Sequence, residues 1–330
     1  MCRICTDPVE SLVELTELDC SGCDTLSAIP PELVHLETMR CSDCPLLVSI
    51  PDTLVRLVHL DCSWSPLVAF IPPTLVQLAR LNCCGCRLVA AIPDTLVHLT
   101  HLLCTYCPLL AHIPDTLVRI ETINCSYCVL IESIPSTFVR LRALYASHCT
   151  RLSLSPDTST SLTTLVVGLC PLVSAIPSTL VRLTYLACFE CPLLTSIPSA
   201  FVNLVTLECG RCDRLLSLPD ALPRIERLEV FDCPRLVALP IVPPHSVFRY
   251  LDGCPWLPQN AADYPLHLPS LLRLQRWFRT GKRQVFKRVI RTRAFNEFVF
   301  HPDRIGGKLV KRQMEAELSN MRPAKQQRVE

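Results

Sequence analysis

Cysteine is the residue whose number and spacing could do chemistry in this chain. The 330 residues include 22 cysteines, and many form pairs three positions apart, such as Cys41 and Cys44 or Cys104 and Cys107. Successive pairs have the spacing C-x2-C-x17-C-x2-C, which formally satisfies the pattern of a zinc site. Such a set of thiols could form disulfides, bind metal ions, or serve as small apolar residues.

The cysteines belong to a repeat of fixed length. The unit reads I-P-x-T-L-V-x-L-x-x-L-x-C-x-x-C-P-L-L-x-x, and residues 50–70 show it well. About twelve copies fill residues 8 to 260. An Ile-Pro or Leu-Pro pair marks the copies in steps of 21 residues, with one double step, and begins at Ile29, Ile50, Ile71, Ile92, Ile113, Ile134, Ile176, Ile197, Leu218 and Leu239.

The length and pattern of the unit indicate how it packs. Twenty-one residues are too few for two helices, and L-x-x-L-x-C ends with the alternation of a strand. The proline stops the strand and favours an extended or polyproline-like return path. One coil cannot bury its Leu, Val and Cys alone, whereas stacked coils share a continuous core.

On these residues the sequence resembles the leucine-rich repeat family. The family pattern L-x-x-L-x-L-x-x-N-x-L maps onto Leu57, Leu60, Cys62, Ser65 and Leu67. The resemblance implies a leucine-rich repeat solenoid with a continuous parallel β-sheet on its concave face and extended, polyproline-like or short 3-10 segments on its convex face. Cysteine usually replaces the Asn of the turn. Because a thiol is a weaker donor than an amide, we expect a weaker ladder of buried side-chain hydrogen bonds.

The repeat gives most cysteines a structural explanation. The two cysteines of each pair occupy two fixed positions of the repeat, and each position forms a column along the stacked coils. Both cysteine columns face inward, where cysteine acts as a small hydrophobe, and no His occupies a ligand position at the same register. We therefore favour packing over zinc or redox chemistry, and predict no metal and no cofactor. Cys2 and Cys5 lie outside the repeat. They are expected either to be reactive thiols or to belong to a frayed cap. Cys84 occupies an outward position and is the better candidate for an exposed thiol.

The outward strand positions vary while the framework stays constant, which is the expected division between scaffold and recognition surface. We expect a protein partner to bind there, with aromatic anchors at the turns after the strands. The alternative is that scattered surface aromatics have no function. The candidate residues are Arg40, His59, Trp64, Arg80, His101, Tyr106, Tyr127, Tyr145, Tyr185, Phe189, Arg227, Phe231 and Tyr250. Two outward positions of each strand form columns along the sheet, and the last residues of these columns are expected at Phe248 and Tyr250.

One coil departs from the pattern. In residues 154–161 the usual Leu-Val of the return segment is replaced by Ser159-Thr160. We expect a local loosening of the convex side. A hinge and a decayed repeat without consequence are the alternatives.

Residues 261–330 form a basic module of different composition. They follow the solenoid of residues 1–260. The chain as a whole has a net charge of +2, yet residues 271–330 hold 11 Arg and 5 Lys against 5 acidic residues, which gives 16 − 5 = +11. A small α-helical module is expected there. Three roles are open to it, in order of preference: a cap on the end of the solenoid, a nucleic-acid-binding element, or a membrane-surface helix. Its basic residues are Arg283, Lys287, Arg288, Arg291 and Arg293.

Function is expected to lie in binding. The sequence contains no H-E-x-x-H, G-x-S-x-G or G-x-x-x-x-G-K-[ST] motif, and it lacks both a signal-peptide pattern and a membrane-spanning run. We expect a monomeric, non-catalytic interaction scaffold in a reducing intracellular compartment, the cytoplasm. The short unit is also similar to repeats of bacterial effectors and large DNA viruses, which implies a viral protein acting on host factors in the host cytoplasm. The alternative is a nucleic-acid-associated protein that uses the basic tail.

Overall fold

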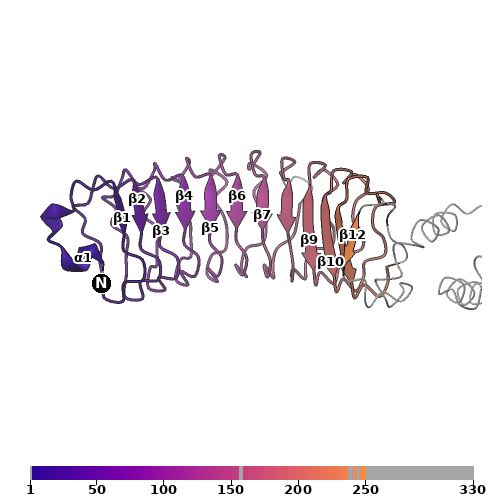
Figure 1. Ribbon diagram of the computed structural model, residues 1–330, viewed down its shortest axis with the longest axis horizontal. Coiled ribbons are helices and arrows are strands. Elements are labelled where there is room, and N and C mark those ends of the chain that lie inside the picture. Colours follow the sequence, from indigo (N-terminus) through magenta and orange to yellow (C-terminus); the bar gives the residue numbers. More distant parts are fainter. Residues whose placement is uncertain (1, 156–158, 237–239, 241, 244–245, 250–330) are drawn as a thin grey trace, which may run out of the picture.

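The chain forms a solenoid with one strand in each coil, as the computed structural model shows (Figure 1). The structure describes residues 2–155, 159–236, 240, 242–243 and 246–249. The predicted module of residues 261–330, the boundary at residue 260 and the site residue Tyr250 lie outside the described residues.

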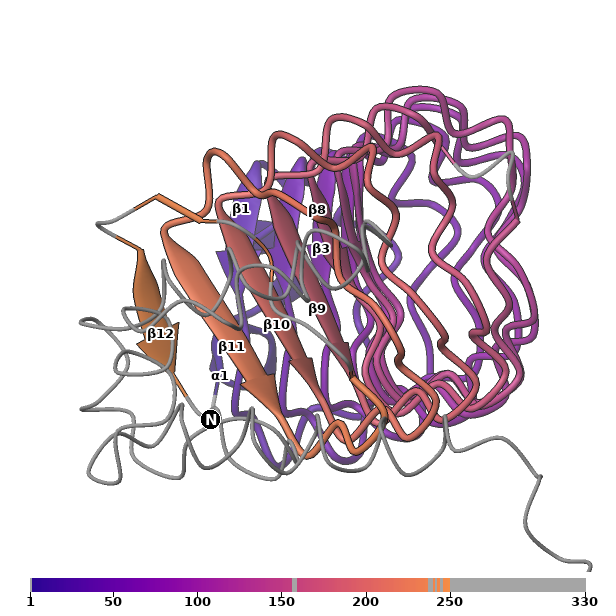
Figure 2. The ribbon, with the colours of Figure 1, turned by 90° about the vertical axis from the view of Figure 1, so that its right-hand side faces the viewer.

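Twelve strands pair in sequence order, and every pairing is parallel. They are β1 (Glu17–Asp19), β2 (Thr38–Arg40), β3 (His59–Asp61), β4 (Arg80–Asn82), β5 (His101–Leu103), β6 (Thr122–Asn124), β7 (Ala143–Tyr145), β8 (Thr164–Val166), β9 (Tyr185–Phe189), β10 (Thr206–Gly210), β11 (Arg227–Phe231) and β12 (Val247–Arg249). The sheet forms one side of the solenoid and turns form the other (Figure 2). The prediction of a leucine-rich repeat solenoid is confirmed.

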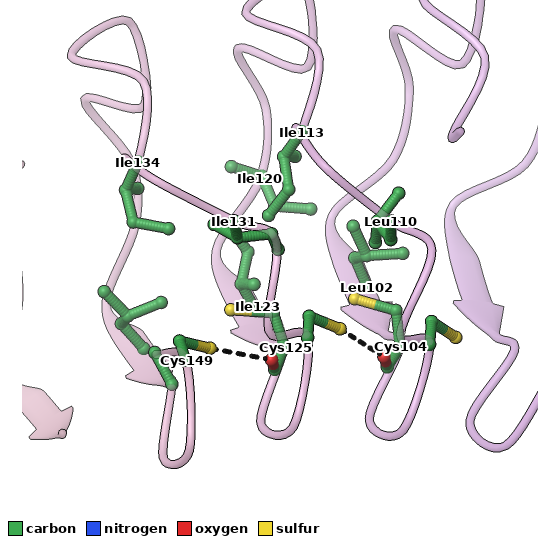
Figure 3. Packing of buried hydrophobic residues seen from close by; sticks show 14 of the residues in the cluster. Leu102, Cys104, Leu110, Ile113, Ile120, Ile123, Cys125, Ile131, Ile134 and Cys149 are labelled. Atoms are coloured by element: carbon green, nitrogen blue, oxygen red, sulfur yellow. Dashed lines mark hydrogen bonds between the residues drawn. The ribbon is translucent and has the colours of Figure 1, made fainter. Parts of the chain in front are cut away.

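A regular coil contributes seven buried side chains to one continuous core. In the fifth coil they are Ile92, Leu96, Leu99, Leu102, Cys104, Cys107 and Leu110, and none is more than 2% exposed. Figure 3 shows how the same positions of successive coils stack on one another. Because each side chain contacts its equivalents in the coils before and after, the core grows with every repeat.

The second cysteine of each pair belongs to a column of thiols that forms a ladder of hydrogen bonds from coil to coil. The Cys149 thiol donates to the carbonyl oxygen of Cys125 at 3.1 Å, and the Cys128 thiol to that of Cys104 at 3.0 Å (Figure 3). Equivalent bonds, also 24 positions apart, are made by Cys44, Cys86, Cys107, Cys170, Cys191 and Cys212. In the one coil with Ser65 at this position, the hydroxyl donates to the carbonyl of Cys41 at 2.9 Å. Cysteine therefore takes over the bonding role expected of Asn.

The return segments are chains of tight turns. Within a coil, Leu117 N–H donates to Pro114 O and Ile120 N–H to Leu117 O. The only 3-10 helix of the described residues is η1 (Val9–Ser11), which lies before β1 at the N-terminal end of the solenoid. The threonine of the repeat joins neighbouring coils on this side, since the Thr116 hydroxyl donates to Asp94 O at 2.7 Å.

Two expectations about register are wrong. Leu67, mapped onto the last apolar position of the family pattern, is 42% exposed, and its neighbour Val68 is buried instead. A tight turn, in which Val68 N–H donates to Ser65 O, places the third residue after Ser65 inward. In the last described coil Arg227 pairs with Val247 and Leu228 with Phe248. That coil is one residue shorter, so Phe248 takes the register of the buried column.

The coil with Ser159 keeps the sheet intact. β7, β8 and β9 pair in register, with Leu144 opposite Leu165 and Leu165 opposite Leu186. Ser159 is buried, and its hydroxyl donates to Leu141 O at 3.3 Å. The sheet therefore passes through this coil without a break. The replacement affects only the turn side, and residues 156–158 lie outside the described residues.

The N-terminal end is covered by the helix α1 (Arg3–Thr6) and by η1, which lie beside β1 (Figure 1). Leu12 is fully buried against the first coil, and Cys2, Ile4 and Leu15 pack against the core. No helix in the described part of the chain is long and apolar enough to cross a membrane.

Candidate binding surface

The turns that follow β1 to β11 use the same backbone conformation. One residue in each turn has a positive φ, as in Trp64 (57°), Tyr106 (60°) and Tyr127 (64°). The full column, which we call the turn column, is Gly22, Asp43, Trp64, Gly85, Tyr106, Tyr127, His148, Leu169, Glu190, Arg211 and Asp232. Glycine adopts this conformation without strain, yet only two members of the column are glycine.

Four members of the turn column form an aromatic stack, which we define as Trp64, Tyr106, Tyr127 and His148. The rings of Tyr106 and Tyr127 stack with centroids 4.1 Å apart, and those of Tyr127 and His148 at 4.0 Å. Trp64 meets Tyr106 at 5.9 Å in a tilted contact. Trp64 and Tyr106 are exposed by 49% and 41%. The rings thus form a row on the edge of the solenoid that follows the C-terminal ends of β3 to β7.

Gly85 makes the first contact of the aromatic stack possible. It occupies the turn-column position between Trp64 and Tyr106, and a Cβ atom there would lie 2.6 Å from the Trp64 ring. The indole therefore lies across the backbone of Gly85 and reaches Tyr106 two coils away. This glycine serves close approach as well as positive φ.

The other two predicted turn aromatics form a separate pair. Phe189 and Phe231 end β9 and β11 and occupy the position before the turn column. Their centroids are 6.0 Å apart, and the Phe231 ring covers Gly210, where a Cβ atom would overlap it. The predicted turn aromatics therefore fall into two groups, because the two phenylalanines lie one residue earlier in their coils, at the ends of the strands.

The remaining predicted site residues lie on the outer side of the strands, apart from Tyr250. Arg40, Arg80 and Arg227 are exposed, whereas His59, His101, Tyr145 and Tyr185 are half-buried. Charged groups gather on the first four strands, where Asp61 accepts a hydrogen bond from Asn82 at 3.0 Å. The middle of the face is neutral, with Leu103, Tyr145 and Val166.

Two groups on the sheet face have shifted acid–base properties. Burial, with Arg80 and Arg40 nearby, lowers the pKa of His59. Its Nδ1 atom is buried and has no hydrogen-bond partner among the described residues. Burial, together with the hydrogen bond that its hydroxyl donates to Glu208 at 2.9 Å, raises the pKa of Tyr185 to about 12. Both groups are therefore neutral at pH 7.

Beyond the aromatic stack, the turn column becomes charged. Arg211 donates to Glu190 at 2.8 Å and lies 3.8 Å from Asp232. This row of ion pairs is exposed, so its contribution to stability is small. The contrast with the aromatic stack shows that the same turn carries different chemistry along the solenoid.

Two features of this surface were misjudged or missed from the sequence. His148 was not among the candidates, although its place 21 residues after Tyr127 is the signal that would have found it. Cys84, expected as an exposed thiol, is half-buried, and burial raises its pKa. The basic residues 283–293 lie beyond the part of the chain that the structure describes.

The fold and its repeat define the class of protein: a leucine-rich repeat solenoid built on a cysteine ladder. No protein-family model matches the sequence, and no curated protein matches it. Among solved structures, the functional domain of InlJ from Listeria monocytogenes, which includes a cysteine ladder, is 17% identical with a TM-score of 0.49, over 74% of this chain and 64% of that one. The chain thus spans slightly less than two thirds of that domain.

Two further structures have lower scores. A plant ice-binding protein is 22% identical with a TM-score of 0.42, over 58% of this chain and 69% of that one. A leucine-rich repeat protein of Leptospira interrogans is 13% identical with a TM-score of 0.37, over 79% and 96%. The assignment of the fold therefore rests on the repeat and the sheet of this chain.

Proposed function

We propose that this protein is a non-catalytic scaffold that binds a protein partner across the outer side of β2 to β8 and the adjoining aromatic stack. The charged first strands and the arginines Arg40 and Arg80 orient the partner, and the neutral centre with Tyr145 supplies apolar contact. Aromatic and arginine side chains are the residues that most often dominate the energy of such interfaces.

The observation that carries the proposal is the backbone conformation of the aromatic stack. Non-glycine residues with positive φ cost on the order of 1 kcal/mol each. Trp64, Tyr106 and Tyr127 nevertheless hold large rings at this position, partly exposed and in contact with one another. Their mutual contacts fix the orientation of the rings before a partner arrives, so little side-chain entropy is lost on binding.

The proposal includes a reducing compartment such as the cytoplasm. The ladder thiols donate hydrogen bonds only as S–H groups, and burial raises the pKa of Cys170 and Cys191 to about 12. Oxidation would remove these donors from the core, and a reducing compartment prevents it. The nucleic-acid alternative depends on the basic tail, and no observation on the described residues favours it.

Site-specific photo-cross-linking in cells of the native host tests the proposal. A photoreactive amino acid replaces Leu103, on the sheet face, or Val118, which is 47% exposed on the turn side. We expect one discrete protein adduct from position 103, lost when Tyr106 and Tyr127 are changed to Ala, and none from position 118. Equal adducts from both positions, or adducts sensitive to nuclease, would overturn the proposal.

A further inference from the structure

The first thiol of the ladder column differs from those of Cys44, Cys86, Cys107 and Cys128. In the later coils the thiol of this column donates to a carbonyl of the preceding coil. The chain before β1 forms α1 and η1 instead of a coil, so Cys23 has no such carbonyl to reach. Its Sγ lies 3.7 Å from Sγ of Cys5 and 3.4 Å from the hydroxyl of Thr25. Although Cys23 belongs to the repeat, its sulfur is used differently.

The two cysteines that the repeat does not explain lie beside it. Cys2 immediately precedes α1 and Cys5 lies within it, and their Sγ atoms are 3.8 Å apart. The sulfurs of Cys2, Cys5 and Cys23 all lie within 4.8 Å of one another. The Cys20 thiol is buried close to that of Cys2 but lies outside this group of three. Three thiols from two separate segments thus meet at the N-terminal end of the solenoid, with the buried thiol of Cys20 as a fourth nearby.

The spacing of these thiols fits a tetrahedral metal site. A Zn–S bond of about 2.3 Å gives an S···S edge of about 3.8 Å in a regular tetrahedron. The observed separations of 3.8 Å and 3.7 Å match this edge, whereas a disulfide would require about 2.05 Å. The sequence spacing Cys2-x2-Cys5-x14-Cys20-x2-Cys23 has the paired form of a structural zinc site with four cysteine ligands.

The surroundings also suit a bound cation. Cys20 and Cys23 are 1% and 2% exposed, while Cys5 is exposed and leaves a path for a metal ion to enter. The Thr25 hydroxyl lies 3.4 Å from Sγ of Cys5 as well as from that of Cys23. Arg3, the nearest basic side chain in sequence, is directed to Asp7 at 3.0 Å. A hydroxyl donor near the sulfurs stabilises thiolates, the form that binds metal.

We propose that Cys2, Cys5 and Cys23 bind one structural zinc ion that fastens α1 over the first coil, and that Cys20 becomes the fourth ligand when its side chain turns toward the other three. Four thiols lose their protons as four Zn–S bonds form, with no change in oxidation state. The site closes the end of the solenoid, where the edge strand β1 and the first buried side chains would otherwise meet water. It departs from the sequence-based prediction of no metal. The reason is that the prediction treated the repeat columns alone and left Cys2 and Cys5 apart.

Metal analysis of the full chain, purified with reductant and zinc and then dialysed, tests the site. We expect about one zinc per chain, and a loss of at least tenfold in occupancy for the double variant Cys2→Ser/Cys5→Ser. The matched control is Cys84→Ser, which removes a half-buried thiol outside the cluster and the ladder. It should keep full occupancy.

Replacement of zinc by Co²⁺ gives a second readout. Tetrahedral thiolate coordination should produce intense visible d–d bands and a sulfur-to-metal charge-transfer band, both absent in the double variant. Circular dichroism shows whether that variant is folded, and we expect it to be, because Cys2 and Cys5 lie outside the core columns. Occupancy below about 0.1 per chain, unchanged occupancy in the folded double variant, or a Cys2–Cys5 disulfide under reducing conditions would overturn the proposal.

Discussion

Sγ of Cys170 lies 3.0 Å from the carbonyl oxygen of Ala146, which is 24 positions earlier in the chain. The same relationship recurs from coil to coil, so the core of this solenoid is joined by thiol hydrogen bonds in addition to apolar contact. Because burial raises the pKa of the Cys170 thiol to about 12, the donor keeps its proton at neutral pH.

The ladder predicts a difference between two substitutions of Cys170. Cys170→Ser retains a donor, and Ser65 shows that the hydroxyl fits this position. It should cost at most about 1 kcal/mol. Cys170→Ala leaves a buried carbonyl unsatisfied and creates a small cavity, so it should cost about 2 kcal/mol or more. Denaturant unfolding measures both values. A serine variant less stable than the alanine variant would show that the thiol acts only by packing.

Gly85 and Gly22 form a matched pair for the aromatic stack. Both have positive φ, at 72° and 69°, but only Gly85 lies under the Trp64 ring, while a Cβ atom at Gly22 would meet nothing within 4 Å. Alanine at either position incurs backbone strain of about 1 kcal/mol. Gly85→Ala must also displace the indole, so its melting temperature should fall further than that of Gly22→Ala. Equal shifts would mean that the Trp64 contact contributes nothing.

His59 predicts a pH dependence of stability. Its folded-state pKa is lowered, chiefly by burial, while the unfolded value is about 6.5. The unfolded chain therefore binds the proton more readily, and the stability associated with neutral His59 is present above about pH 6.5 and lost as the pH falls toward the folded-state pKa. Between pH 7 and pH 5 the wild type should lose more stability than His59→Gln. Parallel pH profiles would contradict this.

The sequence predicted the architecture well because the repeat restates the same pattern in every coil. The strand positions followed from the period, and the buried roles of Cys20 and Cys23 from their inward columns. Small errors arose where a turn decides the register: Val68 is buried in place of Leu67, and the coil before β12 is one residue shorter. A pattern of residue types does not fix the length of a tight turn.

The candidate site was only partly accessible from the sequence. The period places Trp64, Tyr106 and Tyr127 in one column, but the indole crosses to Tyr106 only because Gly85 has no side chain. Likewise, the meeting of Cys2 and Cys5 with Cys23 depends on how α1 folds back against the first coil. Such contacts between segments are set by packing and cannot be derived from spacing alone.

The proposed binding surface is tested most directly by the affinity of the partner captured at position 103. Its dissociation constant is to be measured for the wild type, for Tyr106→Ala/Tyr127→Ala, and for Val97→Ala/Val118→Ala as an exposed apolar control on the turn side. We predict a loss of at least about tenfold, or about 1.4 kcal/mol, for the tyrosine variant and less than about twofold for the valine variant. Unchanged affinity in the folded tyrosine variant, or an equal loss in the valine variant, would contradict the central claim that the aromatic stack is part of the binding surface.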